Sequence, residues 1–93
     1  MKIIWSAEAR KELRAIKQFI ARDSEYYAAR MVASIVERVE KMAVHPTQGH
    51  PVHEYPEKSL REVHQDPYRI IYQTMAEQIE IITIVHFKKS LQS

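Results

Sequence analysis

The sequence predicts an α+β fold, in which an N-terminal strand, an antiparallel α-hairpin and a three-stranded antiparallel β-meander form one sheet with its helical cover. Three observations support this class. β-Branched and aromatic residues crowd 60–87, two stretches of helical apolar periodicity precede them, and a short β-prone segment opens the chain. Since 93 residues have room for one core, we expect 1–93 to form a single domain.

The first elements are a strand at 2–5 and a helix that begins at Ala7. Ser6 between them is a good helix N-cap, and Glu8 is well placed in the first turn. Basic residues occupy the other faces of this helix: Arg10, Lys11, Arg14 and Lys17. Its apolar residues recur at helical spacing: Ala9, Leu13, Ile16 and Ile20. The helix is therefore amphipathic, with a basic outer side.

A second helix follows within a few residues, capped by Asp23 or Ser24 and stopped by Pro46. Its apolar stripe comprises Ala28, Val32, Ile35, Val39 and Met42. A connection this short requires an antiparallel hairpin. We expect both stripes to pack on each other and on the sheet, and we expect 45–58, which is rich in proline, to be a connector.

The meander divides at Gln65 to Pro67 and at Ala76 and Glu77. A symmetric second loop places Met75 opposite Gln78 and Tyr72 opposite Ile81. The face expected to be covered carries Tyr68, Ile70, Tyr72, Thr74, Ile79, Ile81, Thr83 and Val85. The second face carries Arg69, Ile71, Gln73, Glu80, Ile82, Ile84 and His86, with Arg69 diagonally next to His86.

Composition narrows the function classes. The chain has no cysteine, which excludes a disulfide framework, a cysteine zinc site and a cysteine nucleophile. A net charge of +2 is too small to argue for nucleic acid by itself. No segment is long enough to cross a bilayer, so we expect a cytoplasmic protein with no membrane partner.

Histidines and aromatic residues have ordinary interpretations. His45, His50 and His53 lie in a proline-rich loop whose geometry is not fixed by spacing, so we expect no metal site and no cofactor. The tyrosines and Trp5 are interpreted as core and edge packing. No base-stacking surface is predicted.

Cations and one imidazole that could line a sheet face and its exit form the most informative set: Arg61, Arg69, His86, Lys88 and Lys89. They could hold phosphates, or His86 could act as a general acid or base while Arg69 stabilises charge on phosphorus. Alternatively, Arg69 pairs with Glu80 or Glu62 and His86 is a partly buried strand residue. Chemistry alone favours this second interpretation.

Motifs along nearly the whole chain resemble a known superfamily. They are W-S-x-E-A-x-x-x-L at 5–13, G-H-P-V-x-E at 49–54, L-R-E at 60–62, Y-R-I-x-Y at 68–72 and V-H-x-K-K at 85–89. In this order and spacing they resemble the RelE/ParE superfamily of bacterial toxin–antitoxin toxins. The segments at 49–54 and 85–89 are similar to the ParE branch, also called plasmid-stabilisation proteins.

This resemblance implies a toxin that a cognate antitoxin neutralises. The ParE branch poisons DNA gyrase, whereas the RelE branch cuts mRNA on the ribosome. Arg61, Arg69 and His86 match the recurrent polar positions of the superfamily sheet. A RelE-type nuclease tends to have more cations on its central strands and a late catalytic tyrosine, where this chain has Phe87.

We therefore expect a gyrase inhibitor that catalyses nothing. The alternative is a ribosome-dependent endoribonuclease that uses His86, Arg69 and Arg61, and a third hypothesis is a non-toxic antitoxin-binding module. The residues expected to bind the target are Arg61, Arg69, His86, Lys88 and Lys89. The residues expected to bind the antitoxin are Leu13, Ile16, Ile20, Ile71, Ile82 and Ile84.

Overall fold

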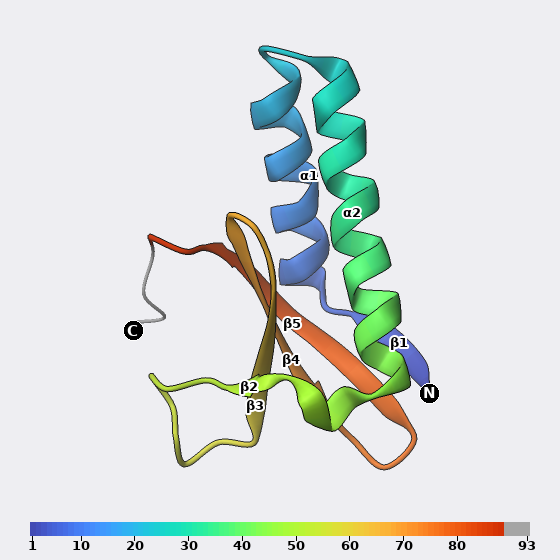
Figure 1. Ribbon diagram of the computed structural model, residues 1–93, viewed down its shortest axis with the longest axis vertical. Helices are drawn as coiled ribbons and strands as arrows, with labels where there is room; N and C mark the ends of the chain where they lie inside the picture. The colour runs from blue at the N-terminus through green and yellow to red at the C-terminus, as the bar shows by residue number, and fades with distance from the viewer. Residues whose placement is uncertain (89–93) are drawn as a thin grey trace.

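A computed structural model of the chain describes residues 1–88 and shows the expected α+β fold (Figure 1). The helices are α1 (Ala7–Ala21), α2 (Glu25–Val44) and a 3-10 turn, η1 (Pro46–Gln48). The strands are β1 (Lys2–Trp5), β2 (His50–Pro51), β3 (Leu60–Gln65), β4 (Tyr68–Thr74) and β5 (Gln78–His86). They form one sheet in the order β1-β5-β4-β3-β2. The N-terminal strand joins the meander as predicted, parallel to β5. The short strand β2 was not predicted.

Serine caps set the starts of both long helices. The Ser6 hydroxyl accepts a hydrogen bond from the Ala9 amide at 2.9 Å, and the Ser24 hydroxyl accepts one from the Tyr27 amide at 3.1 Å. Ser24, and not Asp23, is therefore the second cap. Because proline lacks an amide hydrogen and clashes with the preceding turn, α2 ends at Val44, just before Pro46.

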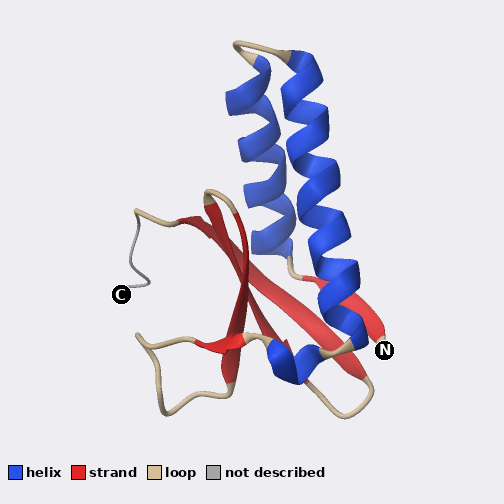
Figure 2. Ribbon diagram, viewed as in Figure 1, coloured by secondary structure: helices blue, strands red, loops and turns tan. Residues whose placement is uncertain are grey.

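The helical hairpin packs on one face of the sheet and projects past it, so that its turn lies far from the strands (Figure 2). The buried core between the layers comprises Ala9, Ile35, Val39, Met42, Val63, Ile70, Tyr72, Ile79, Ile81 and Ile84. Val32 is only half-buried and does not belong to this core, which corrects its predicted role in the stripe.

Four of the five tyrosines divide into two groups. Tyr72 is fully buried and Tyr68 packs against the core, as predicted. Tyr26 and Tyr27 are 63% and 64% exposed, so their interpretation as packing residues was wrong. They lie in the first turn of α2, at the end of the hairpin that projects beyond the sheet.

The register of the β4–β5 hairpin is as predicted near its turn and differs beyond it. Tyr72 lies opposite Ile81, but a β-bulge then shifts the pairing by one residue. Because side chains alternate between faces, this shift moves the rest of β5 to the other face. Ile84 consequently pairs with Ile70 and is buried under the hairpin. The predicted position of Ile84 on the second face was wrong.

The same shift corrects the predicted neighbours of Arg69. Its partner on β5 is Val85, whereas His86 lies opposite Tyr68. Val85 therefore does not take the place on the covered face that a uniform alternation predicts. Thr83 lies opposite Ile71, and its hydroxyl still reaches Glu12 of α1. The predicted proximity of Arg69 and His86 was also wrong, because the two side chains belong to opposite faces.

Candidate functional site

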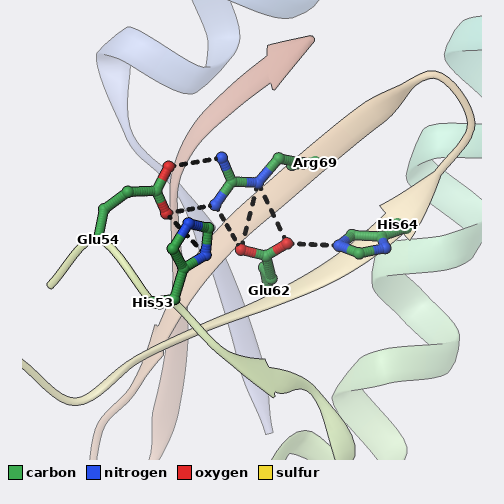
Figure 3. A network of polar contacts seen from close by, with 5 residues as sticks. All are labelled: His53, Glu54, Glu62, His64 and Arg69. Atoms are coloured by element: carbon green, nitrogen blue, oxygen red, sulfur yellow. Dashed lines mark hydrogen bonds and ion pairs between the residues drawn. The ribbon is translucent and has the colours of Figure 1, made fainter. Parts of the chain in front are cut away.

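A buried ionic cluster occupies the second face of the sheet (Figure 3). Arg69 of β4 is 5% exposed and lies between two carboxylates. Its Nη1 and Nη2 atoms donate to Glu54 at 2.8 and 2.7 Å, and its Nε and Nη2 atoms donate to Glu62 of β3 at 2.6 to 3.2 Å. The connector carrying Glu54 is thereby attached to the sheet.

The contacts in this cluster favour the charged forms of Arg69 and Glu62. Hydrogen bonds from Arg69 to Glu54 and Glu62 raise the pKa of the guanidinium, so it remains a cation. Burial alone would raise the pKa of Glu62, but the hydrogen bonds with Arg69 and His64 together hold this pKa below its usual value. His64 contacts Glu62 directly, and His53 lies 3.5 Å from Glu54.

The cluster decides between the two interpretations of Arg69 made from the sequence. Glu62 is its partner, as the packing interpretation proposed, and Glu54 is a second partner that sequence reasoning missed. A guanidinium whose donors are directed at two carboxylates is poorly placed to stabilise charge on a bound phosphate. The motif G-H-P-V-x-E did contain Glu54, but nothing local indicated its partner.

Arg61 and His86 lie at separate places along the sheet. Arg61 pairs in register with Tyr72, and its Nη1 atom donates to the Gly49 carbonyl at 2.6 Å. His86 lies opposite Tyr68, with their rings edge to face at 5.7 Å between centroids. Tyr68 and Tyr72 are four residues apart on β4, about 13 Å along a strand. The three groups predicted for ribonuclease chemistry therefore do not converge.

The other residues predicted for target binding lie at the end of the last strand. Lys88 is exposed, and its amide donates to Nδ1 of His86 at 3.1 Å. The imidazole thus accepts a local hydrogen bond, and its ring is half-buried. Lys89 lies outside the described residues.

The residues predicted to bind an antitoxin fall into two groups. Leu13, Ile16 and Ile20 of α1 are half-buried, as is Ile82 at the bulge. Ile71 and Ile84 are 1% and 3% exposed, so neither offers surface to a partner. The bulge brings Ile84 under the hairpin, and Ile71 lies on the face over which the Glu54 segment folds.

Two adjoining grooves run over the outer side of the hairpin, and sequence reasoning did not anticipate them as grooves. One, of about 200 Å³, is lined by Arg10, Leu13, Arg14, Lys17 and Val32. The other, of about 480 Å³, reaches β1 and is lined by Ile3, Ile4, Trp5, Arg10, Leu13 and Val36. Both have an apolar floor and a basic rim. The basic outer side of the first helix was the sequence signal for this rim.

A helical hairpin on one face of a five-stranded sheet, with the N-terminal strand parallel to the last, is the architecture expected for the RelE/ParE superfamily. The chain belongs to the family described as ParE toxin of type II toxin-antitoxin system, parDE, which matches residues 3–91. Among residues 1–88, no helix is long and apolar enough to cross a membrane.

Comparisons with individual proteins agree with this family. A protein of Sinorhizobium fredii (strain NBRC 101917 / NGR234) named "Putative toxin Y4kP" is 34% identical over 87 residues, covering 91% of this chain and 86% of the relative. A structure of the "Chromosomal ParDE TA system from P. aeruginosa" shares the fold with a TM-score of 0.76 and 22% identity, covering 92% of this chain and 95% of that one. A "YoeB/ParE toxin from Agrobacterium tumefaciens" has a TM-score of 0.64 and 18% identity, with coverages of 92% and 98%.

Proposed function

We propose that this toxin inhibits DNA gyrase in the cytoplasm and that a cognate antitoxin neutralises it. Membership of the ParE family supports a role as the toxin of a type II toxin–antitoxin system. The related P. aeruginosa structure comes from a ParDE system, which supports a protein antitoxin as the partner. The gyrase target is the expectation derived from the resemblance to the ParE branch.

The observation that carries the choice against ribonuclease activity is the environment of Arg69. Metal-free phosphodiester cleavage needs a base, an acid and a charge stabiliser within hydrogen-bond reach of one substrate. Here Arg69 donates to Glu54 and Glu62, on the face opposite His86. An inhibitor that acts by binding requires no such convergence.

Gyrase is proposed to contact the end of β5 and the residues after it, where Lys88 is exposed. Arg61 and His86, together with Lys88 and Lys89, remain the proposed contacts. Arg69 no longer belongs to this set, because its donors are directed at carboxylates in the folded protein.

The antitoxin is proposed to place an acidic amphipathic segment on the two hairpin grooves. Their apolar floor, with Leu13 at the centre, would accept apolar anchors, and the rim of Arg10, Arg14 and Lys17 would select acidic neighbours. Ile16, Ile20 and Ile82 are half-buried and could extend this contact.

The gyrase proposal is tested with purified toxin in two assays. We expect arrest of gyrase supercoiling or accumulation of cleaved DNA, and intact mRNA in toeprinting on translating ribosomes. Deleting residues 88–93 should abolish inhibition without changing the melting temperature, whereas His86→Ala should weaken it much less. Cleavage in the ribosomal A site that His86→Ala removes would instead establish the ribonuclease alternative.

The proposed antitoxin-binding grooves of the toxin are tested by isothermal titration calorimetry, which measures the affinity for the C-terminal half of the cognate antitoxin. Arg14→Glu should weaken binding at least tenfold and make it less dependent on salt, because it reverses a charge at the groove rim. Arg22→Glu, the same change at an exposed site beyond α1, serves as the matched control. Equal effects of the two substitutions would show that the grooves are not the binding surface.

A further inference from the structure

A small polar cavity lies on the hairpin side of the sheet, where α2 descends to the strands and continues into η1 (Figure 1). Its volume is about 130 Å³, roughly ten times the ~10–15 Å³ that one water molecule requires. Met42 and Val63 contribute its apolar part. The polar groups around it come from Arg38, Lys41, His45, Gln48 and Gly49.

The charge of this lining is one-sided. Arg38 and Lys41 are cations, His45 contributes an imidazole and Gln48 an amide, and no carboxylate from residues 1–88 lines the cavity. Glu37 contacts Lys41 at 3.4 Å, but both side chains are about 70% exposed, and such a pair is weak and readily exchanged. The cavity therefore has an uncompensated positive charge.

Arg38 is the unusual member of the lining. Its side chain is half-buried, yet within residues 1–88 it makes no hydrogen bond or ion pair. A guanidinium presents five N–H donors in a planar fork, and a partly buried one usually directs some of them at an acceptor. Arg69 on the other face illustrates the difference, since two carboxylates occupy its donors.

A second arginine extends the positive region. Arg61 reaches the same corner from β3, where its Nη1 atom donates to the carbonyl of Gly49. The Tyr72 hydroxyl donates to the Pro46 carbonyl nearby. These two backbone carbonyls are therefore already occupied, and the cavity lining offers donors on several sides.

We propose that this cavity binds a phosphate-type oxyanion, with Arg38 as its principal donor and Lys41, His45 and Gln48 completing the site. A tetrahedral oxyanion has four oxygens that can accept hydrogen bonds from several directions, which matches donors spread over the end of α2 and η1. A carboxylate has two oxygens in one plane and uses fewer of them. The proposal does not rest on the gyrase target, and none of its four donor residues is a proposed gyrase contact.

The test is a chemical-shift titration of ¹⁵N-labelled protein with sodium phosphate, with ionic strength held constant by sodium chloride. We expect saturable shifts of the Gln48 and Gly49 amides, and little change for amides at the hairpin turn. A second titration uses adenosine 5′-monophosphate in place of sodium phosphate. Tighter binding of the nucleotide would identify a phosphate monoester as the ligand, and equal or weaker binding would identify free phosphate.

Variants assign the binding to the cavity. Arg38→Gln should weaken phosphate binding at least tenfold, and Arg38→Lys should have a smaller effect, because it retains the charge and loses the fork. Arg22→Gln removes the same charge at the far end of the hairpin and should leave binding unchanged. Unchanged amide shifts in the sheet establish that each variant is folded.

Three results would overturn the proposal. The first is a shift that rises linearly with phosphate and is reproduced by chloride, which indicates general screening. The second is saturation by acetate at the same concentration as by phosphate, which indicates a carboxylate site. The third is equal weakening by Arg38→Gln and Arg22→Gln, which would place the binding outside this cavity.

Discussion

The Glu12 carboxylate of α1 accepts hydrogen bonds from the Thr83 hydroxyl and from the Ile84 amide, each at 2.8 Å. Thr83 and Ile84 follow the bulge that shifts the register of β5. A bulge removes backbone groups from the strand ladder, and each must find another partner. The carbonyl of the preceding residue, Ile82, accepts a hydrogen bond from the Ser6 hydroxyl at 2.7 Å. The first helix and its cap thus satisfy polar groups of β5 at and just after the bulge, beyond Ile81, the last residue of β5 that pairs with β1.

Substitutions of Glu12 should separate its hydrogen bonds from its charge. Glu12→Ala leaves the Ile84 amide and the Thr83 hydroxyl without their acceptor, and we expect a loss of about 1–3 kcal/mol in the free energy of unfolding. Glu12→Gln retains one acceptor oxygen and should cost less. Urea unfolding at pH 7 measures both. Equal losses for the two variants would contradict this account.

The pH dependence of Glu12 has a defined sign. Burial raises the pKa of this carboxyl above its usual value, even though the Ile84 and Thr83 hydrogen bonds oppose that shift. A group whose pKa is raised in the folded state contributes stability at low pH and loses it as pH rises through the folded pKa. The stability of wild type relative to Glu12→Gln should therefore fall as pH rises from the usual glutamate pKa through the raised pKa of the folded state. A rise over that window would exclude burial as the dominant effect.

The Arg69 cluster should be sensitive both to substitution and to acid. Arg69→Met removes the guanidinium that lies between two carboxylates, and breaking a buried ion pair costs about 3–5 kcal/mol. Lys41→Met disrupts the exposed pair with Glu37 and should cost less than about 0.5 kcal/mol. Because the pKa of Glu62 is lowered, its contribution should disappear as pH falls through that depressed value. Chemical unfolding at several pH values tests both statements.

Gly49 is required by a steric contact, since its φ of −66° is accessible to any residue. A Cβ atom at this position would lie 2.0 Å from the Tyr72 hydroxyl oxygen and 2.8 Å from the ring carbon that bears it. Tyr72 is fully buried and cannot easily move. Gly49→Ala should therefore destabilise the fold by about 1–3 kcal/mol.

A double-mutant cycle identifies that contact as the cause. Tyr72→Phe removes the hydroxyl and should relieve part of the overlap, so the Gly49→Ala/Tyr72→Phe protein should be more stable than additivity predicts. Thermal unfolding of the four proteins gives the coupling. Additive losses would mean that Gly49 is required for another reason.

Two neighbouring residues of α2 should respond differently to the same substitution. Ile35 is fully buried in the core, and Ile35→Asp would place an unpaired charge there and unfold the domain. Val32 lines the basic groove, so Val32→Asp would place its carboxylate near Arg10, Arg14 and Lys17 and should leave the protein folded. Circular dichroism melting curves compare them. Unfolding of both variants would show that the groove is part of the core.

The sequence by itself determined the features that depend on neighbouring residues. Ser6 and Ser24 begin the helices because a side-chain oxygen reaches an amide three residues ahead, and Pro46 prevents α2 from continuing. The pairing of Tyr72 with Ile81 follows from the turn that joins two adjacent strands. Motif order was also sufficient to predict the toxin superfamily, because it runs through most of the chain.

Only the tertiary structure decided the register of the second half of β5 and the hydrogen-bond partners of Arg69. Alternation predicts one uniform register, but the bulge is stabilised by Glu12, 71 residues away from Thr83, and no local pattern encodes that contact. Glu54 reaches Arg69 only because the connector folds back over the sheet. Both contacts satisfy polar groups that come together only when the helices and the connector pack on the sheet. The first accompanies the register that places Ile84 in the core, and the second holds Arg69 between two carboxylates.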